Sequence, residues 1–251
     1  MNKQLWTAGF EGERILKVLV IPDVHLKPWM FDRAEEILGV NVAERAVCMM
    51  DLADDWGCED DLDLYDETFD RAVAFQKLFP DTLWCYGNHD LSYVWQRYET
   101  GFSEAAIMTV NRRLTELRQT LPHSSQMADI PRIDKVLYMN GGLTEDFVLR
   151  NVPDNARGDI DSTVLRLNCL GRGEMWQEDS PVWFRPQENI EATHREDEFM
   201  QVVGHTPVQR IERDRNVISC DVFSTWPTGE PYGNEEFLLI DTETWDFIGV
   251  K

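Results

Sequence analysis

LWCYGNHDL, residues 83–91, begins as an apolar run and changes at Gly87 into three consecutive polar side chains. Residues 83–86 have the composition of a short buried strand. Asn88, His89 and Asp90 then follow that strand directly with an amide, an imidazole and a carboxylate. These groups bind metal ions or transfer protons. The stretch therefore predicts a strand whose carboxyl end carries residues that can bind a metal ion or transfer a proton.

The same arrangement recurs along the chain. Four further apolar runs end in polar groups or glycine, and each predicts a strand: residues 14–23, 45–51, 134–142 and 198–207. Apolar side chains at helical spacing predict helices at residues 28–40, 63–79 and 92–121. Residues 234–250 contain two β-rich runs around residues 241–243, which predicts a hairpin.

Strands that alternate with helices predict an α/β protein with buried sheets. In such folds ligands bind at the carboxyl ends of the strands, which is where the polar clusters of this sequence lie. The sequence shows no internal repeat, and its 251 residues fit one domain. The polar stretch 150–198 predicts an insertion or cap beside the site.

Composition limits the classes of function. A formal net charge of −22 disfavours a large nucleic-acid interface but permits a small phosphorylated substrate held by metal ions. No apolar run reaches the ~18 residues of a membrane span. Residues 1–14 lack the apolar core of a signal peptide, so a cytoplasmic protein is expected. The five scattered cysteines predict reduced structural thiols.

The polar clusters gain meaning from their number and order. Their candidate site residues are Asp23, His25, Asp51, Asp54, Asn88, His89, Asp90, Asn140 and His205. Any one of them alone is more often a turn residue, a helix cap or a structural histidine. Five such clusters at five strand ends indicate a metal site instead. Carboxylate, imidazole and amide ligands without a thiolate suit Mn, Fe, Ni, Zn or Co.

The set resembles the calcineurin-like metallophosphoesterase superfamily, whose motifs run D-x-H, G-D-x-x-D, G-N-H-D or E, H-G-G and G-H. The resemblance covers residues 18–207. The ending Gly-His-Thr-Pro is similar to the bacterial and phage branch related to serine/threonine phosphatases and diadenosine-tetraphosphate hydrolases. It implies a two-sheet β sandwich flanked by helices, with two divalent metal ions at the strand ends. Mn is the first choice, with Fe, Ni and Zn as alternatives.

The resemblance also implies the metal ligands. Asp23 and His25 would bind the first metal, and Asp51 would bridge both. Asn88 and His205 would bind the second metal. A bridging ligand must be an anion with accessible lone pairs, as Asp51 is, and the Asn88 oxygen adds no negative charge to the centre.

Other residues take roles around the metals. The resemblance makes His89 the acid that protonates the leaving group or stabilises phosphoryl charge, with Asp90 orienting it by a hydrogen bond. Asp54 is expected to hydrogen-bond a metal-bound histidine without binding the metal itself. Arg185, in an element similar to W-x-R-P, is a candidate for substrate binding, although a surface arginine in a cap is an equal alternative.

The sequence departs from the pattern at four positions. Met50 replaces the usual glycine before the bridging aspartate and is expected to narrow the space around the metals. Asn140 replaces the third histidine, which makes it a weaker ligand, an inactivating change or a residue outside the metal shell. Asp55 stands where the phosphoprotein-phosphatase branch carries arginine. Pro207 stands where many phosphodiesterases carry a further histidine.

These features predict a dinuclear-metal-dependent phosphoesterase acting on a phosphomonoester or a nucleotide-type phosphoanhydride, by in-line attack of a metal-bound hydroxide. One alternative is a degenerate family member that binds a phosphorylated ligand or protein with little or no turnover. A third is a phosphodiesterase or nuclease. The expected partner is a small phosphorylated substrate or a phosphoprotein, without nucleic acid or membrane. His123 and His194 are expected to be solvated.

Overall fold

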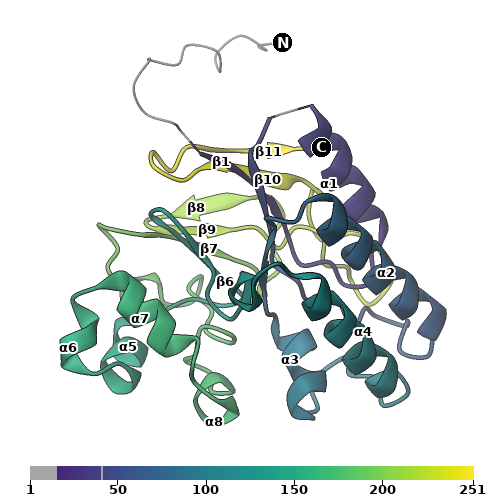
Figure 1. The fold of residues 1–251 in the computed structure, drawn as a ribbon, viewed down its shortest axis with the longest axis horizontal. Helices are drawn as coiled ribbons and strands as arrows, with labels where there is room; N and C mark the ends of the chain where they lie inside the picture. The colour runs from purple at the N-terminus through teal and green to yellow at the C-terminus, as the bar shows by residue number, and fades with distance from the viewer. Residues whose placement is uncertain (1–15, 41) are drawn as a thin grey trace.

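The computed structural model describes residues 16–40 and 42–251. Residues 1–14, in which no signal peptide is expected, lie outside the described residues, as does the start of the predicted strand 14–23. Two β-sheets form the centre of the molecule, and helices flank them (Figure 1). The predicted α/β fold with two stacked sheets in a single domain is therefore confirmed.

The larger sheet has six strands in the order β11-β10-β1-β2-β3-β4. Their bounds, in that order, are Phe247–Val250, Phe237–Asp241, Lys17–Ile21, Arg45–Cys48, Leu83–Cys85 and Met127–Ala128. Strands β1 to β4 are parallel, so the carboxyl ends of β1, β2 and β3 meet at one edge. The predicted C-terminal hairpin is β10 and β11, and β10 pairs antiparallel with β1.

The smaller sheet has five strands in the order β5-β6-β7-β9-β8. Their bounds, in that order, are Arg132–Ile133, Val136–Met139, Met200–Val203, Val217–Ser219 and Glu212–Asp214. Strands β6, β7 and β9 are parallel, and the two edge strands are antiparallel to their neighbours. The sequence reasoning did not anticipate the β8–β9 hairpin, because the short, exposed β8 lacks an apolar pattern.

The period of two along each strand divides the apolar side chains between two cores. Val18 and Val20 of β1 belong to the core between the sheets, together with Tyr138 of β6 and Val202 of β7. Leu19 of β1 belongs to the core beneath the helices. Each such fully buried side chain stabilises the fold by roughly 1.5–3 kcal/mol.

The helices form two groups on opposite sides of the sheets (Figure 1). The first group is α1 Trp29–Gly39, α2 Leu62–Leu78, α3 Asn88–Trp95 and α4 Ile107–Thr120. The second group is α5 Glu145–Asn151, α6 Asp154–Arg157, α7 Ile160–Leu167 and α8 Arg172–Met175. Two short 3₁₀ helices, Ser124–Gln126 and Ile190–Ala192, lie in the connections.

Residues 92–121 are not one helix, contrary to prediction. Helix α3 ends at Trp95, and its cap Gln96 adopts a left-handed conformation with φ 52°. Gly101 follows with φ 86°, a value that favours glycine. The resulting loop separates α3 from α4 and carries Glu99 toward the strand ends.

One of the two remaining histidines differs from expectation in its exposure. His194 is buried and hydrogen-bonded to Glu145, so the prediction that it is solvated is wrong. His123 is exposed, as predicted. All five cysteines lie within the described residues and are free thiols. Among residues 16–40 and 42–251, no helix combines the length and apolarity that crossing a membrane requires.

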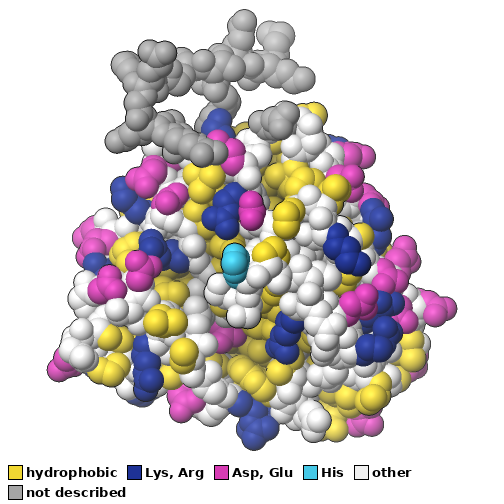
Figure 2. Space-filling model, viewed as in Figure 1, with side chains coloured by type: hydrophobic (Ala, Val, Ile, Leu, Met, Phe, Trp, Pro, Cys, Tyr) yellow, Lys and Arg dark blue, Asp and Glu magenta, His cyan; other side chains and the backbone are white. Residues whose placement is uncertain are grey.

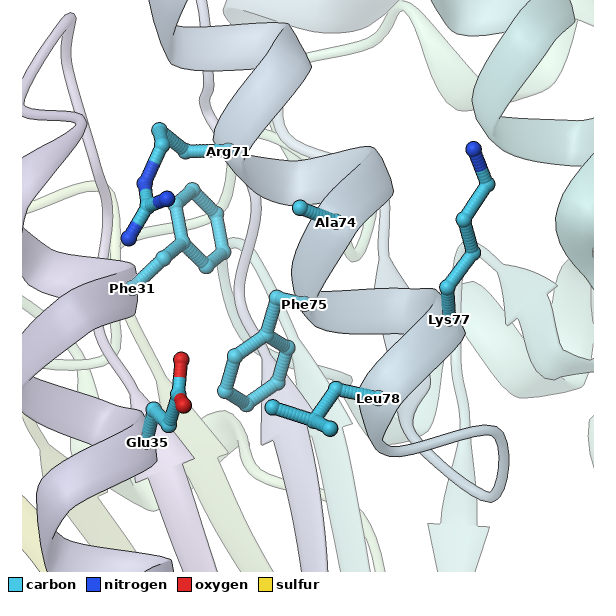
Figure 3. A pocket seen from close by; sticks show the side chains of 7 residues that line it. All are labelled: Phe31, Glu35, Arg71, Ala74, Phe75, Lys77 and Leu78. Atoms are coloured by element: carbon cyan, nitrogen blue, oxygen red, sulfur yellow. The ribbon is translucent and has the colours of Figure 1, made fainter.

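A hollow of 380 Å³ opens between α1 and α2 (Figure 3). Side chains from both helices line it, including Phe31 and Phe75, whose ring centroids are 5.6 Å apart. None of the predicted site residues lines this hollow, so the chemistry must be sought at the strand ends.

Candidate metal centre

Ligand-type side chains from both sheets converge at the carboxyl ends of the parallel strands. They are Asp23 and His25 after β1, Asp51 after β2, Asn88 and His89 after β3, Asn140 after β6, and His205 after β7. Oδ1 of Asn88 accepts hydrogen bonds from Asn140 Nδ2 and from His205 Nδ1, each at 2.8 Å. The His205 backbone N–H donates to Asp23 Oδ2 at 2.7 Å. The structure thus brings residues from both sheets into one cluster.

The backbone is strained at this cluster. Several non-glycine residues have φ in the left-handed region: His25 at 43°, Met50 at 56°, Asp51 at 39°, Asp54 at 65° and His205 at 62°. Such conformations cost about 1–3 kcal/mol each and concentrate at functional sites. The value at Met50 explains why the resembling family has glycine there. The Met50 side chain belongs to the helix-facing core, which contradicts the expectation that it narrows the space around the metals.

Two glycines make room for the carboxylates. A Cβ on Gly87 would lie 1.8 Å from Asp51 Oδ1, and a Cβ on Gly204 would lie 2.0 Å from Asp23 Oδ1. Any side chain at either position would overlap a carboxylate. The glycines of GNHD and GHTP therefore fix where Asp51 and Asp23 can sit.

Several buried ligand atoms in the cluster have no hydrogen-bond partner among residues 16–40 and 42–251. They are Oδ1 of Asp23, Oδ2 of Asp51, Oδ1 of Asn140 and Nε2 of His205. Leaving such atoms unpaired in the interior is costly, and bound cations would reduce that cost. Burial raises the pKa of both Asp23 and Asp51, which is the shift a bound cation would reverse. The donor set therefore fits divalent metal ions.

Distances within the cluster also fit metal binding. Ligand atoms of His25, Asp51 and His89 lie within 4.8 Å of one another. The hydrogen bond from His205 Nδ1 to Asn88 Oδ1 leaves Nε2 as the nitrogen of His205 that can bind a metal.

Two histidines are held in the neutral form that metals bind. Nδ1 of His25 donates to the backbone carbonyl of Asp54 at 2.9 Å, which leaves Nε2 as an acceptor. Burial, and then the charge of His89, lowers the pKa of His25 to about 3. Burial, and then the charge of Arg185, lowers the pKa of His205 to about 3.

His89 is positioned by Asp54. Nδ1 of His89 lies 3.0 Å from Asp54 Oδ2, and Asp54 Oδ1 accepts from the hydroxyls of Tyr65 at 2.6 Å and Tyr93 at 2.5 Å. Burial opposes a charge on His89, but the Asp54 hydrogen bond and the nearby carboxylates outweigh it and raise the pKa of His89 to about 10. Asp54, itself only 1% exposed, anchors the imidazole.

Asp90 does not orient His89, contrary to prediction. Its Oδ1 accepts from the Leu52 N–H at 3.0 Å and its Oδ2 from the Gly87 N–H at 3.2 Å. Asp90 therefore caps α3 and ties its start to the loop after β2. The orienting carboxylate is Asp54, which also supports His25 through its backbone.

Sequence reasoning missed four further acidic or phenolic contributors: Glu99, Asp221, Tyr65 and Tyr93. Asn88 Nδ2 donates to Glu99, whose Oε1 lies 3.8 Å from His89 Nδ1. Asp221 follows β9, is buried, and its charge raises the pKa of Asp23. Tyr93 lies one turn along α3 from His89. Gly101 in the sequence could have indicated the loop that places Glu99 beside Asn88. The sequence around β9 has no pattern that would have placed Asp221 at the site.

Two cations border the cluster. Lys27 Nζ donates to the His25 carbonyl at 3.0 Å and pairs with Asp55 Oδ2 at 2.7 Å. Arg185 Nη1 donates to Thr206 Oγ1 at 2.8 Å and to the His205 carbonyl at 3.3 Å. Thr206 also lines a hollow of 670 Å³, which therefore begins next to the cluster.

The fold and the strand-end cluster define a class: a two-sheet α/β protein with a binding centre for divalent metals. Residues 16–231 match the family model described as calcineurin-like phosphoesterase, so the chain belongs to that family and the predicted membership is confirmed. Members of this family are hydrolases of phosphoesters, typically with two divalent metals. None of the curated proteins matches the chain.

Solved structures of cold-active protein tyrosine phosphatases share this fold at low sequence identity. One is the cold-active protein-tyrosine phosphatase of a psychrophile, Shewanella sp., with 18% identity and a TM-score of 0.56 over 95% of this chain and 81% of that one. A second structure of a cold-active protein tyrosine phosphatase has 18% identity and a TM-score of 0.54 over 95% of this chain and 79% of that one. A metallophosphoesterase from Sphaerobacter thermophilus has 12% identity and a TM-score of 0.47 over 95% of this chain and 89% of that one. At 18% identity the likeness to the two phosphatase structures establishes the fold alone.

Proposed function

We propose that this protein is a dinuclear-metal-dependent phosphoesterase that hydrolyses a phosphomonoester or a nucleotide-type phosphoanhydride. The observation that carries the proposal is the set of buried, unpaired ligand atoms contributed by both sheets to one point. Family membership supplies the reaction class, and the donor set supplies the reason to expect metals.

The ligands divide between two ions. Asp23, His25 and Asp51 would hold the first, and Asp51, Asn88 and His205 would hold the second. When bound, the two ions neutralise phosphoryl charge and activate water for in-line displacement. Oxygen-rich ligands with few imidazoles favour Mn, with Fe, Ni and Zn as alternatives. Asn140 donates both amide hydrogens, to Asn88 and to the Val182 carbonyl, so it orients Asn88 while its own oxygen stays available.

The side chains around the ligands perform proton transfer and positioning. His89 is the proton donor to the leaving group, since Asp54 fixes Nδ1 and directs Nε2 away from it. Tyr65 and Tyr93 hold Asp54, so the imidazole cannot rotate freely. Arg185 binds the substrate phosphoryl group from the side of the smaller sheet.

Surface charge favours a small substrate. Acidic and basic side chains are interspersed over the face shown in Figure 2 and do not form one large basic surface. Together with the net charge of −22, this favours a nucleotide or small phosphomonoester over nucleic acid, with a phosphoprotein ranked close behind.

A degenerate, ligand-binding protein is the second candidate, and Asn140 is the observation that favours it. An amide is a weaker ligand than imidazole for several of these metals. If the second ion is not retained, the protein would bind a phosphorylated ligand with little turnover.

Hydrolysis of p-nitrophenyl phosphate across a Mn²⁺ titration tests the proposal, with bis-p-nitrophenyl phosphate in parallel. Turnover of the monoester by the unaltered chain, with two Mn²⁺ retained, is the expected result. Turnover by Asn140→His alone supports the degenerate candidate, and faster cleavage of the diester supports a phosphodiesterase.

Metal content separates the two roles open to His89. His89→Asn should keep both ions and lose turnover, because the imidazole is assigned as a proton donor. Loss of an ion in this variant would make His89 a ligand and would refute the assignment.

A further inference from the structure

Lys27 lies beside the metal centre without being a ligand. It follows His25 by two residues in a turn closed by its own backbone N–H, which donates to the Val24 carbonyl at 3.1 Å. Its Nζ returns to the His25 carbonyl at 3.0 Å. The side chain is 11% exposed, so it is largely buried but reachable from solvent.

The ammonium of Lys27 is held in place by Asp55. The two form an ion pair at 2.7 Å, and Asp55 is itself fixed by the Thr225 hydroxyl at 2.6 Å and the Trp56 N–H at 2.9 Å. An ammonium has three N–H donors. Within residues 16–40 and 42–251 two of them are used, which leaves one for a further acceptor.

Lys27 and Arg185 make the same kind of contact with the centre, one from each sheet. Each donates to the backbone carbonyl of a ligand-type histidine, Lys27 to His25 after β1 and Arg185 to His205 after β7. The centre that they border holds buried carboxylates, which repel an anionic substrate. A cation at its edge would favour binding of a phosphoryl group there, in addition to the metals.

We propose that Lys27 is a phosphate-binding residue, whose third N–H donates to a phosphoryl oxygen of the substrate. The inference rests on the proposed function for its substrate class. It assigns to Asp55 a negative charge that competes with phosphate for the ammonium, and Asp55→Asn removes this charge while leaving an amide oxygen that can still accept from Lys27.

A structural role for the ion pair makes a different prediction. If Lys27 and Asp55 only joined the loop after β2 to the turn after β1, removing either partner would weaken phosphate binding to the same extent. If Lys27 binds phosphate, Lys27→Met removes the donor, whereas Asp55→Asn removes a competing negative charge and leaves the donor. The two substitutions should then change phosphate affinity in opposite directions.

Calorimetric titration of the Mn²⁺-loaded protein with inorganic phosphate tests this, with bound Mn²⁺ measured on each variant. Lys27→Met should weaken phosphate binding about 10–100-fold, the value of a charge-assisted hydrogen bond. Asp55→Asn should bind phosphate as tightly as the unaltered protein or more tightly. Lys77→Met, the same change of charge on the exposed face of α2, is the matched control and should have no effect.

Equal weakening in Lys27→Met and Asp55→Asn, unchanged affinity in Lys27→Met, or no phosphate binding by the unaltered protein would each overturn the inference. Asp55→Asn decides the matter even if Lys27→Met does not fold, because weaker phosphate binding in it contradicts the assignment. Phosphate bound through Lys27 without turnover would refute the proposed function alone. Turnover of p-nitrophenyl phosphate with Lys27 uninvolved would refute this inference alone.

Discussion

Gly204→Ala should release metal from the centre while leaving the fold intact. The new Cβ would lie 2.0 Å from Asp23 Oδ1 and 2.7 Å from the other carboxylate atoms. An ordinary contact needs 3.4 Å, so the oxygen would have to move by about 1.4 Å. Metal–oxygen distances tolerate only about ±0.2 Å. Asp23 cannot follow by rotating freely, since it is buried and its second oxygen accepts from the His205 N–H.

The assay is metal content after dialysis against a buffer with limiting Mn²⁺, together with circular dichroism. We expect Gly204→Ala to retain at most one ion and to lose affinity for it by more than tenfold, a scale set by the loss of one ligand. Gly173→Ala is the matched control, because nothing lies within 4 Å of its added Cβ. Two ions retained by folded Gly204→Ala would refute the claim that this glycine fixes the position of Asp23.

Three further outcomes are expected. Asp54→Asn should lower kcat ~10–100-fold with metal content unchanged, since it weakens the hold on His89; a parallel loss of metal in mass spectrometry would contradict this. Mn²⁺ at a hundredfold excess over its Kd should stabilise the protein by about 2.7 kcal/mol, and a melting temperature that ignores both Mn²⁺ and chelator would argue against a metal centre. Burial raises the pKa of Asp129 to about 7. The folded state therefore binds this proton more tightly, so stability falls as pH rises from about 4 to about 7. Urea unfolding should show Asp129→Asn relatively more stable at pH 8 than at pH 5, and an unchanged difference would count against the shift.

The sequence predicted the strand-end ligands because each lies directly after an apolar run. A parallel sheet brings such ends together whatever the loops between them do. Asp51 and Asn88 could therefore be placed near each other without knowing how α2 packs. The closing hairpin was equally predictable from two β-rich runs around residues 241–243.

The supporting residues could not be predicted in this way. Asp54 and Asp90 each lie three residues or fewer from a ligand, and only the direction of each side chain decides which one meets His89. That direction depends on left-handed backbone at Asp54 and on the helical start at Asp90, neither of which leaves a mark in composition. Glu99 was hidden because helical spacing continues across the loop between α3 and α4.

The pairing of β10 with β1 also bears on how the chain is made. Strand β1 lies inside the larger sheet, between β2 and β10, yet β10 is synthesised long after β1 leaves the ribosome. Until then one side of β1 has no partner, and such an edge is prone to pairing with other chains. Asp23 and His25 lie directly after β1, so two of the proposed metal ligands follow a strand whose pairing is completed late. Complete pairing of the strand before Asp23 and His25 is therefore expected only after residues Phe237–Asp241 have been synthesised.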